Sequence, residues 1–149
     1  MSAKADYALR GILEIAAAKE PPIKRDQIAR AQKIPVKFLE TILGELKHAG
    51  IVSSQRGADG GYSLAKDPAQ VTVADVIRVI DGPLAHVRDS RPESLDYQGV
   101  AEPLKDVFVA LRAQMREVLE SVTLADLVAR ELPVEITRSV DNPEAWQSR

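Results

Sequence analysis

The sequence predicts a mainly helical fold with one small β-hairpin, in which a winged helix-turn-helix is followed by a long dimerisation helix. Three observations carry this prediction. Two short helical patterns are separated by a break, a glycine-rich hairpin pattern follows them directly, and a heptad repeat of apolar residues comes later. The chain has 149 residues, 45% hydrophobic and 28% charged, which is ordinary for one folded domain with an appendage.

Three helices are expected in the first third of the chain. Apolar residues at helical spacing predict a first helix over residues 5–18, which ends before the proline pair 21–22. A second, short helix is expected over residues 24–31. A third begins near Pro35, whose missing N–H costs nothing in a first helical turn, and ends at Gly50. Its core-facing positions are Leu39, Ile42, Leu43 and Leu46.

The hairpin is expected in residues 51–65, which read IVSSQRGADGGYSLA. Two short extended runs flank a glycine cluster, and glycine supplies the positive φ angles that a tight turn needs. A hairpin placed directly after a helix-turn-helix is a wing. We therefore expect residues 1–83 to form one winged helix-turn-helix domain.

The same capping box, Thr followed three residues later by Asp, begins two later helices, at Thr72 and at Thr123. The first is expected to reach about residue 80 and the second about residue 131. Residues 84–101 lack clear periodicity and are expected to form an irregular connector. Residues 133–149 are expected to be a polar, frayed tail.

A long helix is expected from about residue 102 to residue 121, where apolar residues alternate steps of four and three. This is a heptad seam. With the last helix it gives a dimerisation segment over residues 102–132. The short body before it offers limited cover, so a second copy of the chain is the expected partner, and packing within its own chain is the alternative. The seam consists of Leu104, Phe108, Leu111, Met115, Val118 and Val122.

Charge is unevenly distributed along a chain whose net charge is −2. Residues 1–66 carry 11 Lys and Arg against 7 Asp and Glu, whereas residues 67–149 carry 9 against 15. A basic first half on an acidic chain is the pattern expected if one face meets a polyanion.

Nucleic acid is the polyanion that this fold predicts, because the major groove admits a helix and a basic loop enters the minor groove. Arg56 at the wing is the leading candidate for a groove contact, and a solvated arginine is the alternative. Small residues beside it, Gly57, Gly60 and Gly61, let the backbone approach phosphates. On the outer face of the third helix, the candidates for base contacts are Lys37, Glu40 and Thr41.

Several further side chains are candidates for contacts with the phosphate backbone, although each is equally explained as a surface or packing residue. Lysines and arginines on helix surfaces neutralise phosphates in many complexes, and tyrosine hydroxyls donate to them. The candidates are Lys4, Tyr7, Lys24, Arg25, Lys47 and Tyr62.

An enzyme is not expected. The chain has no cysteine and only two histidines, neither with a nucleophile or carboxylate at motif spacing. The glycine cluster leads into a strand rather than a helix, which argues against a nucleotide-binding loop. The connector is the better place for an effector, since His86, Arg88 and Tyr97 gather there with Asp89 and Arg91; a solvated linker is the alternative.

Five stretches together resemble the Rrf2 family of bacterial winged-helix transcription regulators, over about residues 2–131. They read KADYALRGILEIA, IKRDQIARAQKIPVKFLETILGELKHAGIV, SSQRGADGGYSLAKDP, VTVADVIRVIDGP and VTLADL. The resemblance implies a homodimer that binds an inverted-repeat operator, in most members as a repressor. It also implies Arg56 in the minor groove, and Glu40 with Lys37 and Thr41 at the major groove.

The chain departs from the family at three places. Members that sense an iron-sulfur cluster carry three cysteines in the connector, and residues 84–103 have none, so neither a cluster nor any other metal or cofactor is expected. The family often has glycine at the position of Lys33 and a capping serine at that of Pro35. The alternative function is a winged-helix protein-interaction module that has lost DNA binding and acts through its dimerisation helix and acidic half.

The sequence also predicts a cytoplasmic protein. Its first residues, MSAKADYALR, are not followed by a long apolar core or a small-residue cleavage site. We therefore expect neither a signal peptide nor a membrane anchor.

Overall fold

The computed structural model describes residues 1–88 and 90–148. It confirms a mainly helical fold with one two-stranded antiparallel hairpin. The helices are α1 Ala3–Ala16, α2 Arg25–Gln32, α3 Val36–His48, α4 Val73–Asp81, α5 Leu104–Ser121, α6 Leu124–Ala129 and α7 Val134–Val140. The strands are β1 Val52–Gln55 and β2 Gly61–Leu64, and short 3-10 turns are η1 Pro68–Gln70, η2 Pro92–Ser94, η3 Gly99–Ala101 and η4 Pro143–Trp146.

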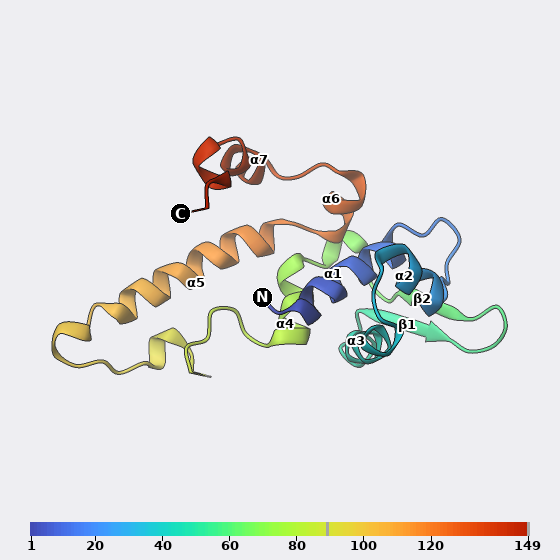
Figure 1. Cartoon of the computed structure of the whole chain (residues 1–149), viewed down its shortest axis with the longest axis horizontal. Helices are drawn as coiled ribbons and strands as arrows, with labels where there is room; N and C mark the ends of the chain where they lie inside the picture. Colours follow the sequence, from blue (N-terminus) through green and yellow to red (C-terminus); the bar gives the residue numbers. More distant parts are fainter. Residues whose placement is uncertain (89, 149) are drawn as a thin grey trace.

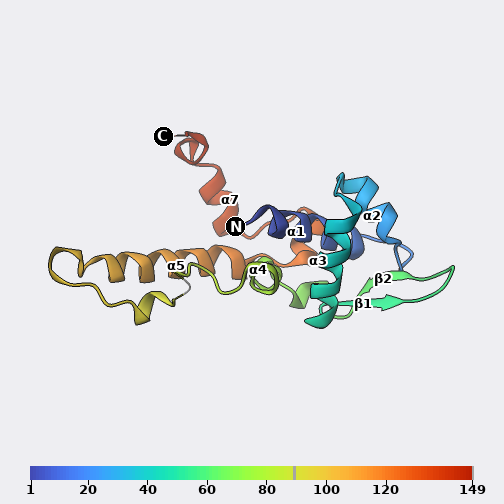
Figure 2. The same ribbon diagram turned by 60° about the horizontal axis from the view of Figure 1, so that its bottom comes forward.

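The molecule consists of a winged-helix body and a long projecting helix (Figure 1). The body comprises α1 to α4, the hairpin and α6. The segment with η2 and η3 runs outward beside α5, and α5 then returns to the body, so the wing and the far end of α5 lie at opposite ends of the molecule (Figure 2). Among the described residues, no helix combines the length and the apolar character needed to cross a membrane.

The core of the body forms where α1 crosses α2, α3 and α4. Ile12 and Ile15 of α1 are buried among the predicted inner face of α3, together with Leu124 of α6. Large aliphatic side chains that are withdrawn fully from water each stabilise a fold by roughly 1.5 to 3 kcal/mol. This packing fixes α3 by one face and leaves its opposite face free. The inner face of α3 is confirmed as Leu39, Ile42, Leu43 and Leu46.

The hairpin is held on the outer edge of β2 as well as by its own strand pairing. β1 pairs with β2 in the register Val52↔Leu64 to Gln55↔Gly61. A third extended residue, Ile23, exchanges two backbone hydrogen bonds with Tyr62, at 2.9 and 2.8 Å. The wing is thereby tied to the chain immediately before α2, so wing and helix-turn-helix form one unit.

The chain after α5 returns to the body through a short backbone ladder. The amide of Val73 donates to the carbonyl of Val122, and the amide of Leu124 donates to the carbonyl of Val71, each at 2.9 Å. Both predicted capping boxes, Thr72 with Asp75 and Thr123 with Asp126, are confirmed directly beside this ladder. The two helix starts are therefore locked side by side.

Two expectations need correction. The expected frayed tail contains the helix α7 and the turn η4, in which the indole Nε1 of Trp146 donates to the carbonyl of Val140 at 2.7 Å. Pro133 at the N-cap presets the backbone for that helix. Val122 does not continue the heptad seam, because α5 ends at Ser121 and the extended residue Val122 is only 6% exposed.

Candidate nucleic-acid interface

The helix-turn-helix turn is made by Lys33, which ends α2 in the left-handed conformation at φ 52°. The amide of Ile34 then returns to the carbonyl of Ala29 at 2.9 Å, and the Ile34 side chain is buried. Glycine adopts this backbone conformation at lower cost than lysine does. The burial of the Ile34 side chain therefore offsets the conformational cost of lysine at this turn.

The outward face of α3 carries the three side chains predicted to meet base edges. Lys37, Glu40 and Thr41 are all exposed. A guanidinium nitrogen of Arg25 on α2 lies 3.2 Å from a carboxylate oxygen of Glu40. This ion pair orients a carboxylate that has the right chemistry to accept from the cytosine amino group.

Two apolar side chains on the same face were not assigned from the sequence. Phe38 is 59% exposed, and Val36 beside it is also exposed. Apolar side chains on a recognition helix contact the methyl group of thymine. Both residues lie in the first turn of α3, before Leu39, the first buried position of this helix. Phe38 lies edge-on to the half-buried ring of Tyr7, with ring centroids 6.4 Å apart.

The wing presents Arg56 at the end of β1. Its side chain is exposed, and it forms no ion pair with any residue that the structure describes. The loop after it needs glycine at two positions. Gly57 has φ +107°, and a Cβ on Gly60 would lie 2.2 Å from the carbonyl oxygen of Gln55. The loop is therefore tight and without bulk, and the guanidinium projects from it.

A shallow concavity of about 370 Å³ joins the wing to the start of α2. It brings together Lys24 and Arg25 with the wing glycines Gly57, Gly60 and Gly61. The lining also includes Asp26, which pairs with Arg25 at 3.4 Å, so Lys24 is its cation without an ion pair among the described residues. A free cation beside small, close-approaching backbone suits a phosphate group. Six of the predicted contact residues thus share one surface: Lys24, Arg25, Tyr62 and the three glycines.

Two other predicted phosphate contacts, Lys4 and Tyr7, are engaged within the chain, whereas Lys47 forms no ion pair with any described residue. The ammonium of Lys4 lies 2.6 Å from a carboxylate oxygen of Glu45 on α3. Tyr7 packs on the core, with the Arg10 guanidinium 5.0 Å from its ring centre. Lys47 is exposed in the last turn of α3. Tertiary pairing of this kind leaves no trace in the local sequence.

Among the described candidate effector residues of the connector, only His86 and Arg91 line one cavity. Arg88 is exposed, and the ring of Tyr97 packs near Phe108 on α5, with centroids 6.4 Å apart. His86 lies instead in a cavity between α4, η2 and α5, and its Nε2 is buried without a hydrogen-bond partner among the described residues. Asp89 lies outside the described residues.

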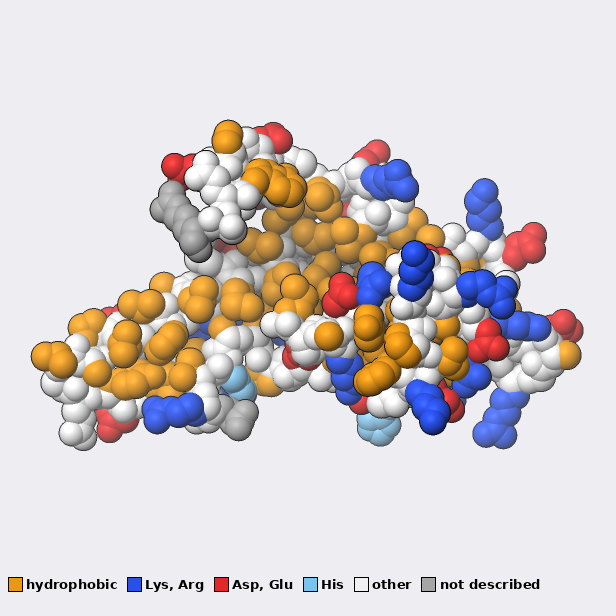
Figure 3. Space-filling model, viewed as in Figure 1, with side chains coloured by type: hydrophobic (Ala, Val, Ile, Leu, Met, Phe, Trp, Pro, Cys, Tyr) orange, Lys and Arg blue, Asp and Glu red, His pale blue; other side chains and the backbone are white. Residues whose placement is uncertain are grey.

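The long helix α5 has no buried residue along its 18 positions. Its apolar side chains form a stripe on the projecting part of the molecule, whereas Lys and Arg side chains gather toward the wing end (Figure 3). Near the body the stripe meets an apolar cavity of about 410 Å³ between the end of α4 and α5. Exposed large apolar residues of α5 are Leu104, Val107, Leu111 and Val118; Phe108 and Met115 are half-buried.

Comparisons with known proteins agree on the kind of molecule. The model of the family described as "Rrf2: Iron-dependent Transcriptional regulator" matches residues 1–130. A protein of Mycobacterium tuberculosis named as an HTH-type transcriptional regulator is 46% identical over 149 residues, covering 99% of this chain and 92% of the relative.

Two solved structures are similar across most of their lengths. The structure of CymR, described as the global cysteine regulator of B. subtilis, has a TM-score of 0.74 and 34% identity, covering 87% of this chain and 96% of that chain. T. potens IscR has a TM-score of 0.71 and 31% identity, covering 100% of this chain and 92% of that chain.

Proposed function

Because the chain belongs to the Rrf2 family of transcriptional regulators, we propose that it binds an inverted-repeat operator as a homodimer and represses transcription there. Its relatives are DNA-binding regulators and not enzymes. The observation that carries the proposal is the pairing of two unpartnered surfaces. One is the outer face of α3 with the Arg56 wing, and the other is the apolar stripe of α5.

The first surface fits a DNA groove. Glu40 and Lys37 offer hydrogen-bonding groups for base edges, Phe38 offers apolar surface, and the basic concavity at Lys24 lies beside the wing. With α3 in the major groove, the wing at Arg56 would enter the adjacent minor groove. The electronegative minor groove attracts an unpaired guanidinium most strongly where it is narrow.

The second surface fits another copy of the same helix. Its exposed residues follow heptad spacing, which packs helix on helix, and a two-fold pair of such faces is self-complementary. Met115 and Val118 of the stripe also line the apolar cavity beside α4, so a partner helix would cover both at once. Two wings would then meet half-sites about one DNA turn apart, roughly 34 Å or a multiple of it.

The iron dependence in the family description does not fit this chain's donor atoms. The chain contains no cysteine, and within residues 1–88 and 90–148 no group of three or more His, Asp or Glu is placed to hold a metal ion. Thiolates are the ligands that iron-sulfur clusters require. We therefore propose that the regulator acts without a cysteine-ligated cluster.

The proposal is tested by capturing fragmented host DNA on the purified protein, with sequencing of what is retained. Wild type and the control Arg138→Ala, which removes an exposed arginine of α7, should retain fragments that share an inverted repeat. Arg56→Ala should lose that enrichment. Placing the captured repeat over a promoter should lower transcript yield in a reconstituted reaction.

Salt dependence separates the proposal from a module that binds only protein. Affinity for the repeat should fall steeply with added salt, because each neutralised phosphate releases counterions. A protein that retains no fragment over background at low salt would have lost DNA binding, which is the alternative function.

A further inference from the structure

A second polar cavity lies where α5 leaves the body. It has a volume of about 280 Å³ and sits between α4, the η2 segment and α5. Among the described residues, its polar lining is strongly cationic, with four arginines and one histidine beside a single carboxylate. These residues are Arg78, Arg91, Arg112, Arg116, His86 and Glu93.

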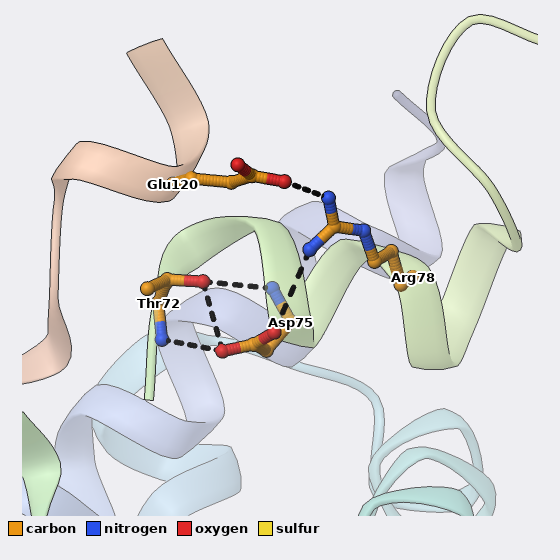
Figure 4. A network of polar contacts seen from close by, with 4 residues as sticks. All are labelled: Thr72, Asp75, Arg78 and Glu120. Atoms are coloured by element: carbon orange, nitrogen blue, oxygen red, sulfur yellow. Dashed lines mark hydrogen bonds and ion pairs between the residues drawn. The ribbon is translucent and has the colours of Figure 1, made fainter. Parts of the chain in front are cut away.

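Two of the four guanidiniums are neutralised within the chain. Arg112, whose side chain is only 13% exposed, pairs with Glu93. The N–H of Glu93 itself and the guanidinium of Arg112 lower the pKa of Glu93, which keeps this partner ionised. Arg78 pairs with Asp75 on its own helix and with Glu120 on α5, so it bridges the body and the long helix (Figure 4).

The other two guanidiniums have no such partner. Arg91 and Arg116 form no ion pair with the described residues, although both line the same cavity. Like charges that share a cavity repel one another unless an anion lies between them. A planar guanidinium fork also matches carboxylate and phosphate oxygens in pairs. Within residues 1–88 and 90–148, the lining therefore carries more positive than negative charge, with Glu93 its one carboxylate.

An orphaned polar atom gives a second, independent indication of a ligand. Nε2 of His86 is buried and has no hydrogen-bond partner among the described residues. A buried polar atom without a partner costs about 1 to 3 kcal/mol, so such atoms are usually satisfied by water or by a ligand. An oxyanion in the cavity would accept from Nε2–H.

We propose that this cavity binds a small polyanion, a metabolite that carries two or more carboxylate or phosphate groups. Its volume of 280 Å³ corresponds to about nine water molecules, which exceeds a single inorganic phosphate. One anionic group would lie between Arg91 and Arg116, with a second toward His86.

A ligand here would act on the joint between the body and α5. Arg78 comes from α4 and Arg116 from α5, and the pair of Arg78 with Glu120 already joins the two helices at this point. An anion that contacts both helices fixes the pose of the body on α5, and thus the spacing of two bodies in a dimer. This regulatory consequence rests on the proposed function, whereas the binding itself does not.

Binding is tested on the full chain by calorimetric titration with citrate and with inorganic pyrophosphate, at ionic strength matched with NaCl. At least one probe should bind saturably with one site per chain. Arg116→Gln should weaken that binding at least tenfold, as should Arg91→Gln. Arg138→Gln, which removes the same charge from α7, should leave it unchanged.

If neither probe saturates the protein, the proposed site is wrong. A partner chain that fills the cavity in a dimer would give this same result. Equal weakening in Arg116→Gln and Arg138→Gln would also overturn it, because binding would then follow net charge alone. The regulatory consequence is measured separately, as a change in affinity for the captured repeat at saturating probe. If the affinity for DNA does not change, the anion binds without regulating DNA binding. If no repeat is captured, the result contradicts the proposed function and leaves the anion site untouched.

Discussion

Arg56 stands at the end of β1 with an exposed side chain and no ion pair among the described residues. If Arg56 enters the minor groove as proposed, its replacement by alanine should weaken operator binding by about 1 to 3 kcal/mol. Fluorescence anisotropy at matched salt measures this loss. Titration curves that superimpose on wild type would remove Arg56 from the interface.

Phe38 offers a test of thymine recognition. Loss of one buried methyl group costs about 0.8 kcal/mol, so deoxyuridine in place of the contacted thymidine should weaken wild-type binding by about that amount. Phe38→Ala should bind the two DNA sequences equally. A variant that still discriminates between them would show that another side chain reads the methyl group. Unfolding curves of Phe38→Ala control for the ring contact with Tyr7.

At the scale of single residues, exposure was predictable and pairing was not. Helical period placed Lys37, Glu40 and Thr41 outside, and all three are exposed. The same period carried no information that Lys4 would meet Glu45, a partner 41 positions away on another helix. Such pairs depend on how α1 crosses α3, which only the packed core determines.

Element boundaries followed local chemistry closely. The two capping boxes begin α4 and α6 where the Thr and Asp spacing predicted them. The missed helix α7 shows the limit of this approach. Its residues are mostly polar, so apolar periodicity did not reveal it, and its start depends on the φ angle of Pro133. Composition alone therefore misassigns a short polar helix as tail.

The cap at Thr72 should contribute measurably to stability. Thr72→Ala removes the hydroxyl that accepts from the amide of Asp75 at 3.1 Å, and it should lower the free energy of unfolding by about 1 kcal/mol. Urea denaturation measures the difference. Thr137→Ala, on the exposed surface of α7, is the matched control and should change stability by less. Equal losses would mean that the cap is not the cause.

The second cap predicts a pH dependence. Hydrogen bonds from the hydroxyl and then the amide of Thr123 lower the pKa of Asp126 below its ordinary value of 3.8. A carboxyl whose pKa is depressed by folding adds stability that is present in full above the unfolded pKa and is lost as pH falls through the folded pKa. Carboxyl NMR titration should give a midpoint below 3.8, and Thr123→Ala should raise it. If Asp126 titrates at the same midpoint in Thr123→Ala as in wild type, the hydrogen bonds from Thr123 do not lower its pKa.

On the scale of the whole molecule, the body and α5 differ in how much apolar surface they leave exposed. The body buries its apolar residues within one chain, whereas α5 keeps a stripe exposed over 18 residues, about 27 Å of helix. A stripe this long is unusual on a monomer, because contiguous apolar surface favours association. The basic surface meanwhile lies at the opposite end, near the wing (Figure 3). Dimerisation through α5 would therefore leave both DNA-binding faces free.

Leu111 lies in the middle of the stripe, so a charge there should divide the dimer. Wild type should elute with twice the chain mass of 16.3 kDa in size exclusion with light scattering, and Leu111→Glu with the mass of one chain. Ala113→Glu adds the same charge about 200° around the helix and should remain dimeric. Since one body reaches only one half-site, Leu111→Glu should also bind a full repeat no more tightly than a single half-site. A Leu111→Glu protein that stays dimeric would show that the dimer interface lies outside α5. A monomeric variant that still prefers the full repeat to a half-site would show that operator recognition does not need dimerisation.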